Sequence, residues 1–152
     1  MVATVIEVVT PSQPFASTPG IRRRMQAVRR SGSVAELALR RAVWHRGLRY
    51  RVDRRPVPSL RRKADLVFVG ARVAVFVDGC FWHVCPEHGN QPTVNTDYWS
   101  AKLARNVERD RETNAALRTA GWLPIRVWEH EDPGRAASLI EAAVRDRRAA
   151  KR

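Results

Sequence analysis

The positions of apolar residues along the chain predict an alternation of helices and strands. Three stretches carry apolar residues at the spacing of an amphipathic helix, namely 34–45, 98–120 and 133–149. At the start of the first stretch, Ser33 and Glu36 have the spacing of a capping box, and Gly47 is placed to end the helix. Glu36 therefore has a structural explanation that requires no function.

Two almost uninterrupted apolar runs, 64–69 and 73–77, are typical of strands buried on both faces, and the short turn between them predicts a tight hairpin. Runs at 48–52 and 122–128 predict two further strands. The elements then follow in the order α-β-β-β-α-β-α, which indicates one α/β domain with a mixed sheet flanked by helices. We expect Trp44 and Trp128 to belong to its core.

The N-terminal part of the chain has a different character. Residues 1–20 show no sustained periodicity and are interpreted as a flexible arm, so that the folded domain is expected over 21–152. Residues 21–30 combine apolar positions at helical spacing with five arginines. This segment predicts either a short basic helix that touches phosphates or a solvated helix face.

The net charge of the chain indicates the kind of molecule that it binds. The 152 residues include 28 Lys and Arg against 15 Asp and Glu, a net charge of +13, which predicts binding to a polyanion such as nucleic acid. We expect no membrane association, because no apolar run is long enough to span a bilayer and the N-terminus lacks the basic and cleavage regions of a signal peptide. A cytoplasmic protein is therefore expected.

A dense group of metal-binding residue types follows the strand at 73–77. Cys80, Cys85 and His88 lie on one loop, and His130 follows a later strand. Two cysteines beside histidines favour metal binding over a disulfide in a cytosolic chain, and Cys₂His₂ is the composition of a closed structural zinc site. The alternative is a pair of buried free thiols.

His83 would be left over once zinc has four ligands. A spare imidazole beside a phosphate is a candidate general acid or base; alternatively His83 replaces His88 as a zinc ligand. Its neighbours Phe81 and Trp82 are interpreted either as core of this loop or as wedges that stack between base pairs.

Two acids occupy matched ends of the predicted hairpin. Asp65 begins one strand and Asp78 ends the other, so the two carboxylates can approach each other at one edge of the sheet. Such a pair predicts a Mg²⁺ site that bridges to a substrate phosphate. The alternative is that each acid caps its strand or pairs with an arginine.

Several motifs together resemble the very short patch repair (Vsr) endonucleases. They are, in order, Ala64-Asp65, Phe76 to His83, Tyr98-Trp99 with Lys102, Asn106 to Asp110, Gly121-Trp122 and Val127 to Glu129. The resemblance covers roughly residues 18–130. It implies a restriction-endonuclease-like (PD-(D/E)xK) fold with a zinc-stapled loop. It also implies strand-specific nicking of duplex DNA 5′ to the thymine of T:G mismatches, which arise when 5-methylcytosine deaminates.

The resemblance also implies roles for single residues. Asp65 and the main-chain carbonyl of Val77 match Mg²⁺ contacts, His83 matches a histidine that assists the attacking water, and Glu36 matches a glutamate oriented into the site. Intercalating and base-contacting positions of the family are matched by Met25, Phe81, Trp82, Lys102 and Asn106. The structural zinc positions are matched by Cys80, Cys85, His88 and His130, with His and Cys exchanged at some of them.

The chain departs from the family pattern at the metal site and in its flanks. Asp78 stands where the best-known member has a histidine, and Val77 where it has a threonine, so Asp78 is a candidate direct ligand of Mg²⁺. The longer N-terminal arm and the loop 54–63 are expected to touch DNA and to influence the target sequence.

Together these observations predict a Mg²⁺-dependent nicking endonuclease that acts on double-stranded DNA as a monomer, with possible mismatch-repair partners and association with the nucleoid. Two rivals remain: a restriction or phage-defence nuclease of the same fold without mismatch preference, and a non-catalytic, zinc-containing DNA-binding module.

Overall fold

The computed structural model describes residues 32–89 and 92–151, and their elements follow the predicted order. These elements are α2 (Val34–His45), β1 (Arg51–Arg54), β2 (Ala64–Phe68), β3 (Val73–Asp78), α3 (Thr96–Thr119), β4 (Leu123–Trp128) and α4 (Pro133–Ala149). The expected arm 1–20, the basic segment 21–30 and Met25 lie outside the described residues.

The four strands form one mixed sheet in the order β1-β2-β3-β4. β1 pairs with β2, and β2 with β3, in antiparallel fashion, while β3 and β4 run parallel. A parallel pair needs a long crossover, which α3 supplies. The central strands β2 and β3 are almost wholly buried, which confirms the prediction from their continuous apolar runs.

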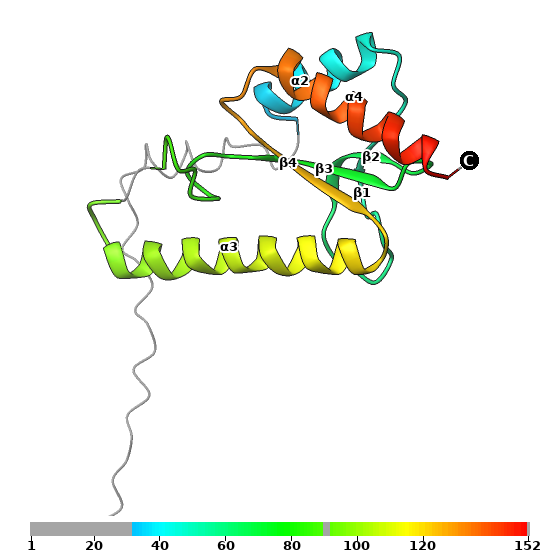
Figure 1. Cartoon of the computed structure of the whole chain (residues 1–152). Helices are drawn as coiled ribbons and strands as arrows, with labels where there is room; N and C mark the ends of the chain where they lie inside the picture. Colours follow the sequence, from blue (N-terminus) through cyan, green and yellow to red (C-terminus); the bar gives the residue numbers. More distant parts are fainter. Residues whose placement is uncertain (1–31, 90–91, 152) are drawn as a thin grey trace, which may run out of the picture.

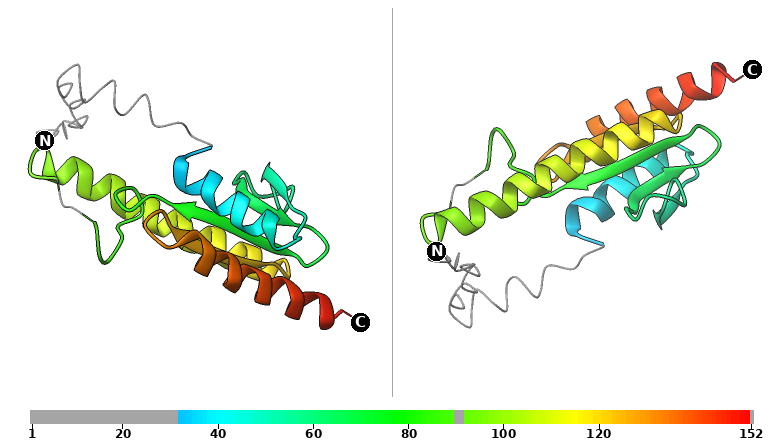
Figure 2. Two further views of the ribbon diagram at one scale, coloured as in Figure 1. Left: turned by 90° about the horizontal axis from the view of Figure 1, so that it is seen from above. Right: turned by 90° about the horizontal axis from the view of Figure 1, so that it is seen from below.

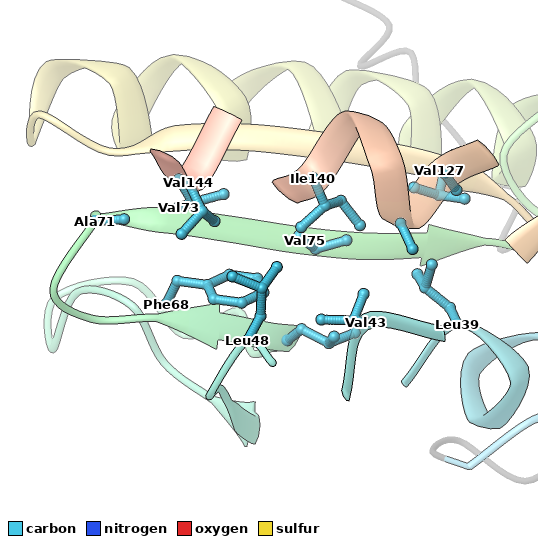
Figure 3. Packing of buried hydrophobic residues seen from close by; sticks show 13 residues of the cluster. Leu39, Val43, Leu48, Phe68, Ala71, Val73, Val75, Val127, Ile140 and Val144 are labelled. Carbon is cyan, nitrogen blue, oxygen red and sulfur yellow. The ribbon is translucent and has the colours of Figure 1, made fainter. Parts of the chain in front are cut away.

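Helices cover both faces of the sheet (Figure 1), with α2 and α4 on one face and the long α3 on the other. Between α2, α4 and the sheet lies the main core, which includes Leu39, Val43, Phe68, Val75 and Ile140 (Figure 3). A smaller cluster under α3 contains Val67, Phe76 and Leu117. The long α3 extends past the sheet beneath the segment that follows β3 (Figure 2).

Local signals at the helix ends agree with the sequence. Ser33 Oγ accepts the main-chain NH of Glu36 at 3.2 Å, which is one half of the predicted capping box, but Glu36 Oε2 accepts the NH of Gly32 at 2.7 Å rather than that of Ser33. A cap of this kind stabilises a helix by about 1 kcal/mol. Of the helices that the structure describes, none combines the length and apolarity that a membrane span requires.

Some expectations were wrong in detail. Trp44 is 51 % exposed and lies on the surface under the Arg49 guanidinium, because the face of α2 that meets the sheet is carried by Glu36, Leu39 and Val43. Trp128 is half-buried rather than a full core residue. The first strand begins at Arg51, three residues later than predicted, since Leu48 belongs to the core before the strand starts.

Candidate active site and metal centre

Asp65 lies where the paired stretch of β2 and β3 ends. The ladder runs from Phe68–Val73 to Leu66–Val75. Asp65 precedes Leu66, and its Oδ2 accepts the main-chain NH of Val77 at 2.7 Å. A side-chain hydrogen bond thus follows the last main-chain pair of the ladder. It connects Asp65 to Val77, whose carbonyl was predicted to contact Mg²⁺.

The surroundings of Asp65 leave its negative charge poorly compensated. The pKa of Asp65 is raised to about 6, mainly by burial and in addition by the charges of Glu36 and Asp78, against the effect of the Val77 NH. Arg40 lowers the pKa only weakly. A half-buried carboxylate with two acidic neighbours and little positive charge is a place where a divalent cation fits.

Glu36 is 4 % exposed, accepts the Gly32 NH before the start of α2 and forms an ion pair with Arg40 one turn later. Its charge also raises the pKa of Asp65. A role of Glu36 in the active site stays a prediction.

Asp78 lies in a separate network on the α3 side of the sheet. Arg126, in the neighbouring strand β4, donates from Nη1 to Asp78 Oδ1 at 2.9 Å and to Oδ2 at 3.1 Å. The same nitrogen lies 3.2 Å from Asp110 Oδ1 on α3. His83 Nδ1 bonds to Asp110 Oδ2, and His83 Nε2 lies 3.8 Å from Asp78 Oδ1.

Asp78, His83 and Asp110 bring their ligand atoms within 4.8 Å of one another, whereas Asp65 joins no such group of three among the described residues. Asp78 therefore has the arginine partner that the sequence left open as an alternative. A shared ion between Asp65 and Asp78 stays a prediction.

The network fixes the orientation and charge of His83. Burial lowers the pKa of His83, but the hydrogen bond to Asp110 and the charges of Asp78 and Asp110 outweigh it and raise the pKa above its usual value. Burial raises the pKa of Asp110, yet the contacts with His83 and Arg126 bring it below the ordinary range. Since an ionised Asp110 accepts the Nδ1–H, the Nε2 atom carries the exchangeable proton towards Asp78.

Sequence reasoning assigned no role to Asp110 or Arg126. Asp110 ends the motif Asn106 to Asp110, and its position on α3 meets the loop after β3 only in the folded chain. Arg126 interrupts the apolar strand Leu123–Trp128, and a lone charge inside such a strand was a signal for a buried partner. Arg126 also stacks over the Phe76 ring at 4.6 Å.

The four residues predicted to bind zinc come together. Cys80, Cys85, His88 and His130 bring their ligand atoms within 4.8 Å of one another, although they lie on two segments about 45 residues apart. His130 Nδ1 is 3.1 Å from Cys80 Sγ and 3.7 Å from Cys85 Sγ. His83 points instead to Asp110, which favours His88 over His83 as the fourth member.

The chemistry of this group fits a thiophilic cation. Both cysteines are buried and free of a disulfide. Burial and the neighbouring Cys85 raise the pKa of the Cys80 thiol to about 11, so a thiolate is unfavourable there without a metal. A bound cation would lower this pKa and favour the thiolate. The loop turns tightly here: a Cβ on Gly89 would lie 2.5 Å from the Cys85 carbonyl oxygen, so only glycine fits.

Phe81 and Trp82 are half-buried in an aromatic cluster and belong to neither core cluster of the sheet. The Phe81 ring centroid lies 5.1 Å from that of Trp82 and 5.5 Å from that of Trp99, and Tyr98 extends the cluster. These side chains pack on the first turns of α3, so a core of the loop and a wedge for base pairs both stay open as predictions.

Two predicted DNA contacts border this aromatic cluster. Lys102 Nζ lies over the rings of Trp99 and Trp82, at 5.2 Å and 5.4 Å from their centroids. Asn106 Nδ2 donates to the Trp82 carbonyl at 3.1 Å, so this side chain fastens the loop to α3. Its contact with bases stays a prediction.

Acids and a histidine at one end of a mixed sheet, next to an aromatic and cationic surface, are features of a nuclease. Comparisons with known proteins agree. The family model described as DNA mismatch endonuclease Vsr matches residues 17–88.

Curated relatives match most of the chain. A "Type II nicking enzyme V.NaeI" of Lentzea aerocolonigenes is 55 % identical over 129 residues, 84 % of this chain and 78 % of the relative. A "Type II nicking enzyme V.NmeDIP" of Neisseria meningitidis serogroup C is 37 % identical over 136 residues, 86 % of this chain and 90 % of the relative. The "DNA mismatch endonuclease Vsr" of Escherichia coli K12 is 32 % identical over 124 residues, 79 % of this chain and 76 % of the relative.

The chain belongs to the Vsr family. It is a DNA endonuclease, and DNA is its substrate.

Proposed function

We propose that this protein nicks one strand of duplex DNA 5′ to the thymine of T:G mismatches in a Mg²⁺-dependent reaction, as the first step in the repair of deaminated 5-methylcytosine. The observation that carries the proposal is the poorly compensated Asp65 carboxylate bound to the Val77 NH, at the same end of the sheet as the His83–Asp110 pair. Relatives named as nicking enzymes support nicking, and a relative named as a DNA mismatch endonuclease supports mismatch cleavage.

Asp65 and the main-chain carbonyl of Val77 would hold Mg²⁺, and Asp78 would do so in competition with Arg126. When bound, Mg²⁺ supplies positive charge against the scissile phosphate and the leaving oxygen. Glu36 adds negative charge beside Asp65 and thereby favours a cation there.

His83 is the proposed acid–base group. Asp110 accepts the Nδ1–H and fixes the ring, so that Nε2 is free to exchange a proton with the attacking water or the leaving oxygen. Arg126 holds Asp78 and Asp110 on either side of the imidazole, and its charge lowers the pKa of both carboxyl groups, although burial leaves the pKa of Asp78 raised. A positioned histidine of this kind contributes about 10²- to 10⁴-fold to a rate.

Mismatch recognition is assigned to the aromatic cluster of Phe81, Trp82, Tyr98 and Trp99. Apolar wedges enter base steps most easily where pairing is already weakened, as at a mismatch. The Lys102 ammonium over these rings places a positive charge at the same surface. Lys102 and Asn106 are the proposed contacts to the mismatched bases, and Met25 is proposed to intercalate together with Phe81 and Trp82.

Zinc at Cys80, Cys85, His88 and His130 is proposed as a structural staple. It would hold the loop that carries Phe81, Trp82 and His83, so that one ion sets the position of both wedge and acid–base group. Elemental analysis of protein purified without added metal should give one zinc per chain. Cys85→Ala should lose that zinc, whereas the exposed His45→Ala should retain it; full occupancy in Cys85→Ala would contradict the assignment.

The test of the function is a nicking assay on 5′-labelled duplexes that differ at one base pair. With Mg²⁺ present, a T:G duplex should be cut in the thymine strand only, immediately 5′ to that thymine, and omission of Mg²⁺ should abolish the cut. T:A and C:G duplexes of the same sequence are the controls. Equal cleavage of matched and mismatched duplexes would favour a defence nuclease, and no cleavage in any sequence context would favour a DNA-binding module.

A further inference from the structure

A basic cavity whose lining contains none of the proposed catalytic residues has no part in the proposed reaction. It has a volume of about 570 Å³ and lies between β1, the loop 55–63, β2 and the start of β4. Its apolar floor includes Val67 and Trp122, and its rim carries Arg51, Arg54, Arg55 and Lys63. The lining thus combines an apolar base with four cations.

The positive charge of this cavity is largely uncompensated. Asp53 is the single acid in the lining, and its Oδ2 lies 3.3 Å from Lys63 Nζ. Arg51, Arg54 and Arg55 are exposed and form no ion pair with any residue in 32–89 or 92–151. Three unpaired guanidinium groups around one hollow favour a bound anion.

The backbone of β1 is distorted in a way that gathers these cations. In a regular strand, successive side chains point to opposite faces, yet the consecutive residues Asp53, Arg54 and Arg55 all line this cavity. Asp53 has φ = 51°, a left-handed conformation inside a strand, which breaks the alternation. Such a conformation costs about 1 kcal/mol or more and persists where the surrounding structure requires it.

The position of the cavity relates it to the scissile phosphate. The lining runs past Asp65 in both directions. Lys63 precedes Asp65 by two residues and Val69 follows it by four, so the lining extends along the chain direction of β2 from about 7 Å before Asp65 to about 13 Å after it. At 3.4 Å per base pair, the whole lining lies within about four base pairs of a phosphate level with Asp65. Because β1 is an edge strand, the cavity opens at the side of the sheet.

We propose that this cavity is a second backbone-binding site, which holds the sugar–phosphate backbone of duplex DNA within about four base pairs of the nick. The guanidinium groups of Arg51, Arg54 and Arg55 bind phosphodiester oxygens, and the apolar floor at Val67 and Trp122 contacts deoxyribose. A phosphodiester chain satisfies both parts of the lining, whereas a small inorganic anion satisfies the rim alone. The site anchors the flank of the target and reads no bases.

The first test is DNA binding without cleavage, measured by fluorescence anisotropy in buffer lacking divalent metal. Arg51→Gln/Arg55→Gln should weaken binding about tenfold at low salt and reduce the slope of log K against log salt by about two. The loss should be equal for T:G and matched duplexes, because backbone contacts carry no sequence information. Arg135→Gln/Arg148→Gln on α4, which covers the opposite face of the sheet, is the charge-matched control.

The second test locates the contact with duplexes that carry a single neutral methylphosphonate linkage. In the parent protein, neutralising one of the linkages within about four base pairs of the nick position should weaken binding. In Arg51→Gln/Arg55→Gln the same linkage should have no further effect. An unchanged salt slope, a loss no larger than in the α4 control, or undiminished sensitivity to the methylphosphonate would overturn the proposal. Neither test depends on mismatch preference, so failure here and failure of the proposed nicking reaction are distinguishable.

Discussion

Asp65 and Asp78 form an instructive comparison, since they are the same residue type at the same end of neighbouring strands. Asp78 is 4 % exposed and receives two hydrogen bonds from Arg126. Asp65 receives a main-chain NH and lies beside the negative charge of Glu36. One acid thus has a full cationic partner within the chain, and the other does not. The difference supports the proposal of a cation at Asp65 and of a role for Asp78 in fixing Arg126 and His83.

The largest expected effect comes from the uncompensated acid. Asp65→Asn keeps an oxygen that can accept the Val77 NH but removes the charge that would bind Mg²⁺. We expect the single-turnover nicking rate to fall by about 10⁴-fold, equivalent to about 5 kcal/mol of transition-state stabilisation. DNA affinity without Mg²⁺ should be retained. A rate within tenfold of the parent would show that Asp65 is not at the reacting centre.

The His83–Asp110 pair should give the next largest effect. His83→Ala should slow nicking by about 10²- to 10⁴-fold, and Asp110→Asn should slow it less, because the ring remains but loses its fixed tautomer. His45→Ala, at the end of α2 and exposed, is the matched control. If Asp110→Asn leaves the pH profile of nicking unchanged, Asp110 does not act through His83.

Removal of Arg126 tests, through protein stability, how much Asp78 depends on its cationic partner. Arg126→Leu leaves Asp78 and Asp110 without their cation, and we expect the free energy of unfolding to fall by about 2–4 kcal/mol in urea denaturation. Arg126→Leu/Asp78→Asn should recover part of that loss. Arg111→Leu, which removes a surface pair with Glu108 at 3.8 Å, should cost under about 1 kcal/mol. Equal losses for Arg126 and Arg111 would mean that the Asp78 pair is unimportant.

The smallest expected effect is a gain in stability when Asp65 loses its charge in Asp65→Asn. Its carboxyl binds a proton more tightly in the folded chain, with a pKa of about 6, than in the unfolded chain. Ionised Asp65 therefore lowers stability above pH 6, and this cost disappears as pH falls towards 4. Without divalent metal, the free energy of unfolding of Asp65→Asn in urea should exceed that of the parent by about 1 kcal/mol at pH 7. At pH 4 the two proteins should be equally stable. A variant less stable at pH 7 would contradict this assignment.

Much of the fold could be predicted from local patterns. The element order, the buried β2–β3 hairpin and α4 at Pro133–Ala149 were all confirmed. The pattern failed at Trp44, because an apolar residue one position beyond the sheet-facing Val43 lies about 100° away around the helix. It also missed the left-handed Asp53, since no local signal marks a strained residue that tertiary contacts hold in place.

The sequence by itself determined the inventory of the site: an acid at the start of β2, an acid at the end of β3, and cysteines and histidines of zinc-binding composition. Periodicity and residue chemistry are local properties, so they are readable without a fold. Only the tertiary structure decided the partners. The parallel pairing of β3 with β4 puts Arg126 beside Asp78, and the crossover α3 brings Asp110 to His83. Those contacts join residues 27 and 48 positions apart, and such long-range pairing is set by the packing of whole elements rather than by any motif.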